Sequence, residues 1–184
     1  MWGRRKNCYP AQLQNLLGKE YSVRNFGANV STMQKTADLP YWNHEKFFAS
    51  TEFKPDIVFL MLGSNDSKTH NWKNIEAFIH DYREMVIHYR SLPSNPVIYV
   101  MTPPKQFIVR NNAVVYFDMS DEIVDEMARA IKTLAEAENL NVIDINAITA
   151  SHPECFWLDG VHPNAAGARI IAESVYAAIS SGGN

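Results

Sequence analysis

The sequence predicts a three-layer α/β sandwich, in which helices cover both faces of a mostly parallel sheet. Four short runs of strand length alternate with four longer segments whose apolar residues repeat at helical spacing. Most of the short runs are continuously apolar, which is typical of strands buried on both faces. The alternating order of helix and strand favours parallel strands joined by right-handed crossovers.

The first half of the chain supplies one predicted helix and two predicted strands. Tyr9–Leu17 carries leucines on one helical face, and Tyr21–Phe26 alternates weakly, so we expect a helix followed by a strand. Asp56–Leu62 is nearly all apolar and is expected to form a buried strand.

The second half repeats the pattern more clearly. Ile75–Leu92, Ser120–Ala137 and Asn164–Ile179 repeat apolar residues every three or four positions, as one-faced helices do. The apolar runs Pro96–Met101 and Asn141–Ile145 are expected to form strands between them.

Length, composition and charge exclude several classes of protein. The 184 residues, 46% hydrophobic and 20% charged, suit one folded domain over residues 1–184 and exclude intrinsic disorder. The net charge is −3, and the basic cluster Arg4–Lys6 is too short for a nucleic-acid footprint, so we expect no nucleic-acid partner. The apolar run Ile57–Leu62 falls far below the roughly 20 residues of a membrane-spanning helix.

Compartment and redox state are less constrained. No apolar stretch follows Arg4–Lys6 as it would in a secretory signal, which favours a cytoplasmic protein. A periplasmic or secreted location stays open if a leader precedes Met1. Cys8 and Cys155 are too few and too far apart for a zinc site, and we favour two free thiols over one bridge.

Polar residues follow the predicted strands, and the carboxyl ends of parallel strands are where sites form. Asp159 can accept a hydrogen bond from one ring nitrogen of His162, which leaves the other nitrogen as a general base. The side-chain amide of Asn65 and the main-chain N–H of Gly27 could stabilise an oxyanion. Each motif alone is also explained by ordinary structure, because Gly, Ser, Asn and Asp are turn formers and Pro163 suits the first position of a helix capped at His162.

Together, three blocks resemble the SGNH or GDSL hydrolase family, which comprises lipase- and esterase-like enzymes on a flavodoxin-like sheet. The blocks are Asn25-Phe26-Gly27, Gly63-Ser64-Asn65-Asp66 and Asp159-Gly160-Val161-His162-Pro163-Asn164, and the match covers about residues 9 to 179. The resemblance implies a serine ester hydrolase that needs no metal or cofactor. In this reading Gly27 and Asn65 are oxyanion donors, and Asp159 and His162 are the catalytic acid and base.

The branch of the family is indicated by the last block. The run DGVHPNAAGA, with HPECFW just before it, is most similar to the branch that acts on acetylated sugars. The resemblance therefore implies an O-deacetylase or short-chain carboxylesterase with a small-molecule ester as substrate.

One family block is absent from these residues. The family begins with a strand ending in Gly-Asp-Ser, whose serine is the nucleophile, and no Gly-Asp-Ser occurs in the 184 residues. Tyr9–Leu13 already resembles the helix after that block, so we expect the chain to be inactive or nearly so. Ser31 and Ser64 lie in suitable loops, but neither is on a strand-to-helix elbow. Truncation, a misplaced start codon and natural loss of the strand all stay open.

The missing strand has a structural consequence. In the family's sheet it lies between the strands that correspond to Tyr21–Phe26 and Asp56–Leu62, so its loss leaves a gap of about 9.6 Å. Unpaired N–H and C=O groups would face that gap at a cost in stability. We expect either that the two strands close up side by side or that a strand is borrowed from a neighbour, which would give a homo-oligomer through exposed sheet edges.

Alternatives remain at this point. A non-catalytic relative could use the same cleft to hold a carbohydrate or an acyl group. A nucleotide-binding role is excluded because no glycine-rich phosphate loop follows a strand. Trp42, Trp72 and Trp157 lie near the expected cleft and could stack on sugar rings, although we favour core packing for them. Lys105–Met119 has no clean period and is expected to form a loop over the site.

Overall fold

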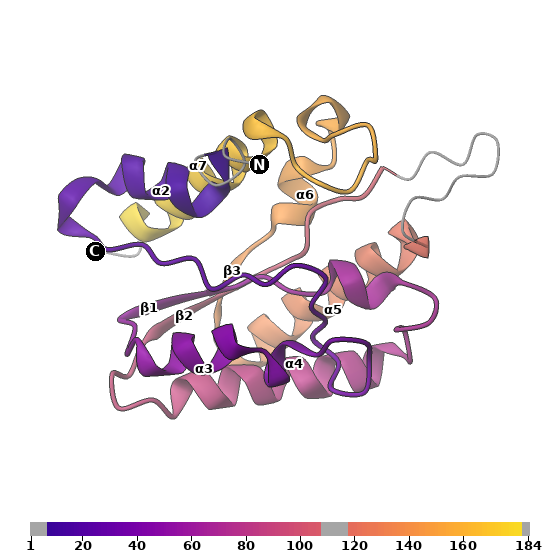
Figure 1. Cartoon of the computed structure of the whole chain (residues 1–184), viewed down its shortest axis with the longest axis horizontal. Helices are drawn as coiled ribbons and strands as arrows, with labels where there is room; N and C mark the ends of the chain where they lie inside the picture. Colours follow the sequence, from indigo (N-terminus) through magenta and orange to yellow (C-terminus); the bar gives the residue numbers. More distant parts are fainter. Residues whose placement is uncertain (1–6, 108–117, 182–184) are drawn as a thin grey trace.

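A computed structural model describes residues 7–107 and 118–181 of the chain. It confirms the three-layer α/β sandwich: α2, α6 and α7 cover one face of the sheet, and α3, α4 and α5 cover the other (Figure 1). The elements are α2 (Tyr9–Leu17), α3 (Glu45–Glu52), β1 (Ile57–Leu60), α4 (Ile75–Arg90), β2 (Val97–Met101), α5 (Asp121–Glu138), β3 (Asn141–Ile143), α6 (Ile145–Thr149) and α7 (Ala165–Ser181).

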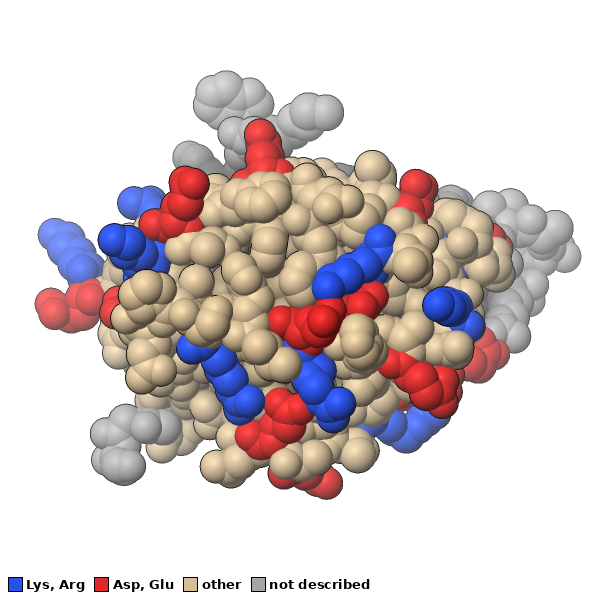
Figure 2. Space-filling view, turned by 90° about the horizontal axis from the view of Figure 1, so that it is seen from below, with Lys and Arg blue, Asp and Glu red and all other residues tan. Residues whose placement is uncertain are grey.

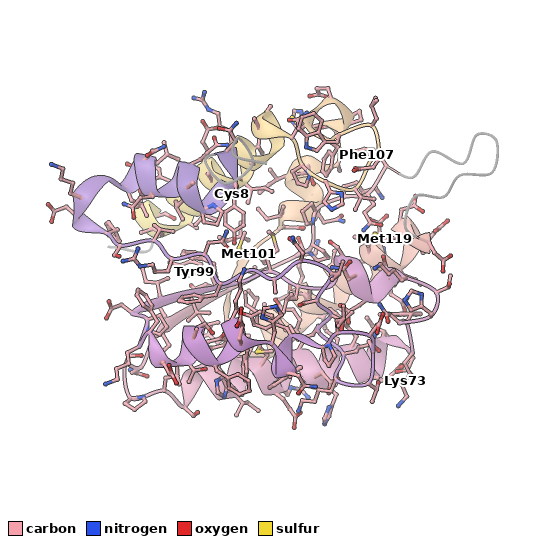
Figure 3. The ribbon with its side chains drawn as sticks, in the orientation of Figure 1. Cys8, Lys73, Tyr99, Met101, Phe107 and Met119 are labelled. Carbon is pink, nitrogen blue, oxygen red and sulfur yellow. The ribbon has the colours of Figure 1, made fainter. Side chains whose placement is uncertain are left out.

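The described sheet has three strands in the order β1-β2-β3, and both pairs are parallel. Val58 pairs with Ile98 and Val100 pairs with Val142. Because successive side chains point to opposite faces, β2 supplies Val100 to the core under α4 and α5, and Tyr99 and Met101 to the core under α2 and α7 (Figure 3). The strands thus hold two apolar cores together.

The long helices begin where the sequence provides capping side chains. Asn74 accepts a hydrogen bond from the N–H of Ala77 at 2.8 Å and starts α4. Ser120 accepts one from the N–H of Ile123 at 3.3 Å and starts α5, so the capping residues agree with the helical periodicity.

Helix α3 was not predicted from the sequence. It has eight residues, and only Phe47 and Ser50 of these are buried, so its apolar periodicity is weak. The ring of His44 caps it by accepting from the N–H of Lys46 at 3.1 Å. Short helices of this kind depend on tertiary packing more than on intrinsic propensity.

The prediction of a strand at Tyr21–Phe26 is wrong. The segment is extended but lies outside the sheet, and within the described chain no backbone hydrogen bond joins it to β1. The side chain of Gln14 engages it instead: Gln14 accepts from the N–H of Val23 at 2.8 Å and donates to the carbonyl of Tyr21 at 3.0 Å. The expected closure of this segment onto β1 is therefore wrong as well, and a cavity of about 620 Å³ separates them.

Charged side chains of both signs are intermixed on the face seen in Figure 2, which looks at the helices below the sheet. Several form ion pairs between neighbouring elements, such as Arg83 of α4 with Glu138 of α5. Among the helices of the described chain, none combines the length and apolar character that crossing a bilayer requires.

Candidate active site

Asp159 and His162 form a hydrogen-bonded pair in the turn before α7. Oδ2 of Asp159 lies 3.0 Å from Nδ1 of His162. The other oxygen, Oδ1, accepts from the main-chain N–H groups of Val161 and His162, each at 2.9 Å. One carboxylate therefore fixes both the turn and the orientation of the imidazole ring.

The charge of Asp159 follows from these contacts. Partial burial on its own would raise the pKa of Asp159, but the amides of His162 and Val161 and the imidazole outweigh it and hold the pKa below its ordinary value. The carboxylate is thus ionised at neutral pH. An ionised Asp159 favours the tautomer of His162 that is protonated on Nδ1 and stabilises a positive charge on the ring.

Gly160 allows this turn to reach the segment that follows β2. Its φ of +66° is in the left-handed region, and a Cβ atom there would lie 2.1 Å from the carbonyl oxygen of Phe107. The N–H of Phe107 donates to the carbonyl of Gly160 at 2.8 Å, and the rings of Phe107 and Phe156 pack at 5.1 Å. Figure 3 shows Phe107 beside the turn, which is thereby attached to the carboxyl end of the sheet.

The expectation that Pro163 begins the last helix with His162 as its cap is wrong. The cap is Asn164, whose Oδ1 accepts from the N–H groups of Ala166 and Gly167 at 2.9 and 3.2 Å. Pro163 instead forms an isolated antiparallel bridge with Phe156. His162 consequently lies three residues before Ala165, the first residue of α7, and its side chain is half-exposed.

Asn65 lies in the short 3₁₀ turn that follows β1. Gly63 precedes it with a φ of +133°, which turns the chain sharply at the strand end. The Nδ2 atom of Asn65 donates to the carbonyl of Ser31 at 3.1 Å. The amide group has two hydrogens, so this bond orients the side chain while using one of them.

Gly27 is exposed, and its N–H donates to Oδ1 of Asn25 at 2.9 Å within its own turn. The structure thus pairs Asp159 with His162, and it links Asn65 to the loop that follows Gly27. The main-chain N–H of Gly27 points to the side chain of Asn25 in its own turn. Asn65 follows β1, and the turn of His162 is bonded to the segment after β2, so both lie toward the carboxyl end of the sheet.

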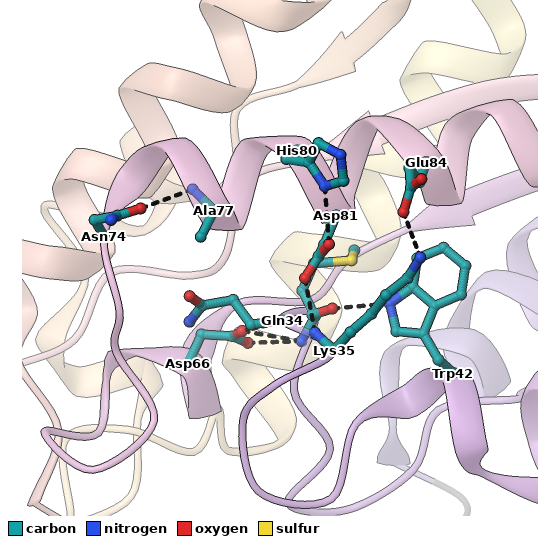
Figure 4. A network of polar contacts seen from close by, with 10 residues as sticks. Gln34, Lys35, Trp42, Asp66, Asn74, Ala77, His80, Asp81 and Glu84 are labelled. Carbon is teal, nitrogen blue, oxygen red and sulfur yellow. Dashed lines mark hydrogen bonds and ion pairs between the residues drawn. The ribbon is translucent and has the colours of Figure 1, made fainter.

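Asp66 is a further residue of this region, which sequence reasoning treated only as a turn former. It is completely buried, and its carboxylate accepts from the N–H of Met33 at 2.9 Å and the N–H of Gln34 at 2.8 Å (Figure 4). Burial raises the pKa of Asp66 to about 6, although the two amides act in the opposite direction. Asp66 therefore holds residues 31–34 against the end of β1, which in turn places the carbonyl that Asn65 contacts.

A second group of contacts fixes the other end of the same loop (Figure 4). The N–H of Lys35 donates to Asp81 at 2.7 Å, and the ammonium of Lys35 lies 4.2 Å from the ring of Trp42. The indole N–H of Trp42 donates to the carbonyl of Met33 at 2.9 Å. Trp42 therefore has a packing role, as does Trp72, whose ring lies 6.1 Å from that of Phe78.

Trp157 differs from the other two tryptophans. Its exposed fraction is 52%, and the next residue, Leu158, is 96% exposed. Both belong to the turn that carries Asp159 and His162, and the N–H of Trp157 donates to the carbonyl of His162 at 2.9 Å. An apolar surface of this kind beside a polar pair is suited to contact with a ligand.

Ser31 and Ser64 were considered as replacements for the nucleophilic serine, and the structure shows the surroundings of both. Ser31 is only 2% exposed, which puts its hydroxyl out of reach of a substrate, and the carbonyl of Ser64 accepts from Ser67 inside the 3₁₀ turn. No disulfide joins Cys8 to Cys155 in the described part of the chain, which agrees with the preference for two thiols over one bridge.

Two clusters of possible metal ligands lie outside the Asp159–His162 pair. In the described part of the chain, three potential ligand atoms lie within 4.8 Å of one another in each of two sets. These sets are His152, Glu154 and Cys155, and His80, Asp81 and Glu84.

Comparison with known proteins places these features in context. A sequence profile of the GDSL-like lipase/acylhydrolase family matches residues 1–170. An acetylxylan esterase of Xylanibacter ruminicola is 34% identical over 194 aligned positions, which include 96% of this chain but 39% of that protein. The chain therefore spans well under half the length of this curated relative.

Solved structures show the same fold. A carbohydrate acetylesterase family member from Sinorhizobium meliloti superposes with a TM-score of 0.78 and 22% identity, over 96% of this chain and 86% of that chain. An acetyl xylan esterase, AlAXEase, superposes with a TM-score of 0.71 and 22% identity, over 96% and 93% of the two chains.

Proposed function

The chain belongs to the GDSL-like lipase/acylhydrolase family, and from this premise we propose that it is the scaffold of a serine esterase that removes acetyl groups. The observation that carries the proposal is the Asp159–His162 pair, with 3.0 Å between Oδ2 and Nδ1. A short-chain carboxylesterase or an O-deacetylase would use this pair in the same way.

The reaction assigns one task to each residue. A serine hydroxyl attacks the ester carbonyl while Nε2 of His162 takes its proton, and the charge on the ring is stabilised by Asp159. His162 then protonates the departing alcohol, which leaves an acetylated serine. Water attacks this second ester by the same route, releases acetate and restores the serine.

The oxyanion formed in each step requires fixed donors. The second hydrogen of the Asn65 amide is oriented by the bond of the first to Ser31. The N–H of Gly27 would first have to release Asn25. We therefore assign Asn65 the larger share of oxyanion stabilisation, with Gly27 contributing after its turn rearranges.

The nucleophile determines how active these residues are by themselves. No Gly-Asp-Ser occurs in the 184 residues, and Ser31 is buried. In the family the nucleophilic serine belongs to the Gly-Asp-Ser block, so we propose that these 184 residues, which lack that block, turn over acetate esters at nearly the uncatalysed rate when they are alone.

An acetylated sugar is the substrate class that the surroundings favour. Trp157 and Leu158 offer an exposed apolar surface on the turn that carries the catalytic pair, and an indole face can stack on a sugar ring. The relatives named above as acetylxylan and carbohydrate acetylesterases support this assignment.

A chromogenic acetate ester tests the proposal. The 184-residue chain should give almost no turnover, whereas the same chain extended at its N-terminus by a strand that ends in Gly-Asp-Ser should turn over the ester. Changing that serine to alanine, or making His162→Asn, should remove the activity. A folded, extended chain without turnover would contradict the esterase proposal.

A non-catalytic carbohydrate or acyl binder is the second candidate, and an exposed Trp157 in a sequence of 184 residues without a Gly-Asp-Ser motif favours it. Binding of acetylated xylo-oligosaccharides that is equal with and without the added serine strand, in the absence of turnover, would support this function.

A further inference from the structure

Three side chains with metal-binding atoms meet in the short turn that follows α6. His152 precedes the 3₁₀ turn Pro153–Cys155, and Glu154 and Cys155 belong to it. Nδ1 of His152 lies 3.0 Å from Oε1 of Glu154, and Sγ of Cys155 lies 3.9 Å from the same oxygen. All three ligand atoms lie within 4.8 Å of one another, so a single ion could contact them together.

The separations of these atoms are close to those around a zinc ion. Zinc binds imidazole nitrogen, carboxylate oxygen and thiolate sulfur at about 2.0–2.3 Å, usually with tetrahedral geometry. Tetrahedral ligands at these bond lengths lie about 3.3–3.6 Å apart. The imidazole of His152 and the sulfur of Cys155 therefore need only small movements relative to Glu154 to share one ion.

The donor set selects the class of cation. Thiolate and imidazole favour zinc and similar transition-metal ions, whereas Mg²⁺ and Ca²⁺ prefer oxygen ligands. The thiol of Cys155 donates toward Oε1 of Glu154. An ion that binds there takes the place of the thiol proton, which is released to solvent, and the sulfur becomes a thiolate ligand.

The second cluster of potential ligands, His80, Asp81 and Glu84, already contacts a cation of the chain (Figure 4). The ammonium of Lys35 pairs with Glu84, and the main-chain N–H of Lys35 donates to Asp81 at 2.7 Å. This cluster also lacks a sulfur ligand. A metal ion would have to displace Lys35 there, so the turn after α6 is the more favourable site.

The turn after α6 is open to solvent on one side. The side chains of His152 and Glu154 are 41% and 67% exposed, whereas Cys155 is buried. Within residues 7–107 and 118–181, Glu154 forms an ion pair with His152 and with no lysine or arginine. An ion that arrives at the exposed carboxylate therefore meets no competing cation from these residues, and the sulfur lies 3.9 Å from the carboxylate oxygen.

We propose that His152, Glu154 and Cys155 bind one zinc ion, with water as the fourth ligand. The site goes beyond the proposed esterase function and does not depend on it. The spacing of the two cysteines does not indicate it, because the site uses only one of them, together with a histidine and a glutamate.

Zinc in this turn would stabilise its contact with the start of α7. The carbonyl of Cys155 accepts from the N–H of Asn164 at 2.9 Å, and the carbonyl of Glu154 accepts from Nδ2 of Asn164 at 2.7 Å. A Cβ atom on Gly167 would lie 2.2 Å from the carbonyl oxygen of Cys155, so the turn lies directly against α7. An ion that fixes the ligands should therefore slow the local opening that separates the turn from the helix.

Titration of the metal-free, reduced chain with zinc tests the site. Isothermal titration calorimetry should give one ion per chain, with a dissociation constant on the order of micromolar or tighter. Zinc at about 100 times that constant should raise Tm by about 5–10 °C. Amide hydrogen exchange at Asn164 should slow about tenfold or more, because its N–H is bonded to the carbonyl of Cys155.

Cobalt(II) in place of zinc identifies the ligands. The parent chain should show a sulfur-to-cobalt charge-transfer band, which Cys155→Ser should remove and Cys8→Ser, the matched control, should keep. Glu154→Gln and His152→Ala change exposed side chains, so both variants should fold, and each should weaken zinc binding about tenfold or more. His80→Ala, in the second cluster, should bind zinc as the parent chain does.

Three results would overturn the proposal. They are the absence of saturable zinc binding, a cobalt complex of the parent chain without the charge-transfer band, and zinc binding that is unchanged in Cys155→Ser. Binding that is lost in His162→Asn but kept in Cys155→Ser would assign the ion to the Asp159–His162 pair and would overturn it as well. None of these readouts involves an ester, so failure here and failure of the proposed function are distinguishable.

Discussion

A single carboxylate, that of Asp159, both closes the turn before α7 and orients the imidazole of His162, because Oδ2 of Asp159 lies 3.0 Å from Nδ1 of His162. The two tasks use different oxygens: Oδ1 accepts main-chain N–H groups and Oδ2 contacts the ring. The fold of the turn and the orientation of the proposed base are therefore coupled, and this coupling makes the site testable by substitution.

Asp159→Asn should reduce kcat of the serine-extended chain by about 10³- to 10⁴-fold, because an amide cannot stabilise the imidazolium and favours the wrong tautomer. The KM should change little. Since Oδ1 of asparagine still accepts from Val161 and His162, the free energy of unfolding should fall by about 1 kcal/mol or less. Steady-state kinetics and urea unfolding measure the two effects, and a loss of stability without loss of kcat would contradict the assignment.

Gly160→Ala should destabilise the chain far more than Gly18→Ala. Both glycines have a positive φ, +66° and +69°, and Gly18 combines it with a ψ of −151°, so an alanine at either position carries backbone strain of about 1–3 kcal/mol. Only at Gly160 would the new Cβ meet another atom, the Phe107 oxygen at 2.1 Å, whereas nothing lies within 4 Å at Gly18. Urea unfolding of the two variants isolates the contact, and equal losses would show that Phe107 is not held against this turn.

Asp66 should make stability fall as the pH rises. Its pKa is raised from 3.8 to about 6 in the folded state, so the folded chain binds the proton more tightly than the unfolded chain does. The stabilisation is complete below about pH 4 and is lost as the pH rises toward 6, by a few kcal/mol.

Comparison with Asp66→Asn isolates this effect, because asparagine does not titrate. The variant should gain stability relative to the parent chain between pH 4 and pH 7, as measured by urea unfolding at several pH values. Parallel curves for the two proteins would mean that Asp66 ionises in the fold as easily as in the unfolded chain.

Trp157→Ala should change substrate preference and leave stability nearly intact. The side chain is 52% exposed, so its removal should change the free energy of unfolding by less than about 1 kcal/mol. In the serine-extended chain, kcat/KM for an acetylated xylo-oligosaccharide should fall about tenfold, while that for a small acetate ester should stay the same. Trp42→Ala is the contrasting variant, because loss of its core packing should cost several kcal/mol.

Much of the fold was predictable because strong periodicity and burial coincide. β1, β2 and β3 arise from the apolar runs at 56–62, 96–101 and 141–145, and the long helices α4 and α5 begin at residues that cap well. The pairing of Asp159 with His162 was predictable because both residues lie within one tight turn. Local sequence is sufficient for such features.

The features that the sequence did not predict correctly depend on contacts between residues far apart in the chain. Tyr21–Phe26 has the alternation of a strand, but its pairing depends on what lies beside β1, and Gln14 provides the nearer partner. Asp66 looks like a turn residue, and only the fold brings it to the amides of Met33 and Gln34, 33 and 32 positions earlier in the chain. The sequence contains no local signal for either.

Acetyl transfer to an added serine tests the central claim most directly. A peptide strand that fits beside β1 and ends in Gly-Asp-Ser would be mixed with the 184-residue chain and a chromogenic acetate ester, and its mass followed over time. The account predicts an acetyl group on the peptide serine and release of the chromophore with the parent chain, and neither with His162→Asn. Acetylation that proceeds equally with both proteins, or a bound peptide that is never acetylated, would contradict it.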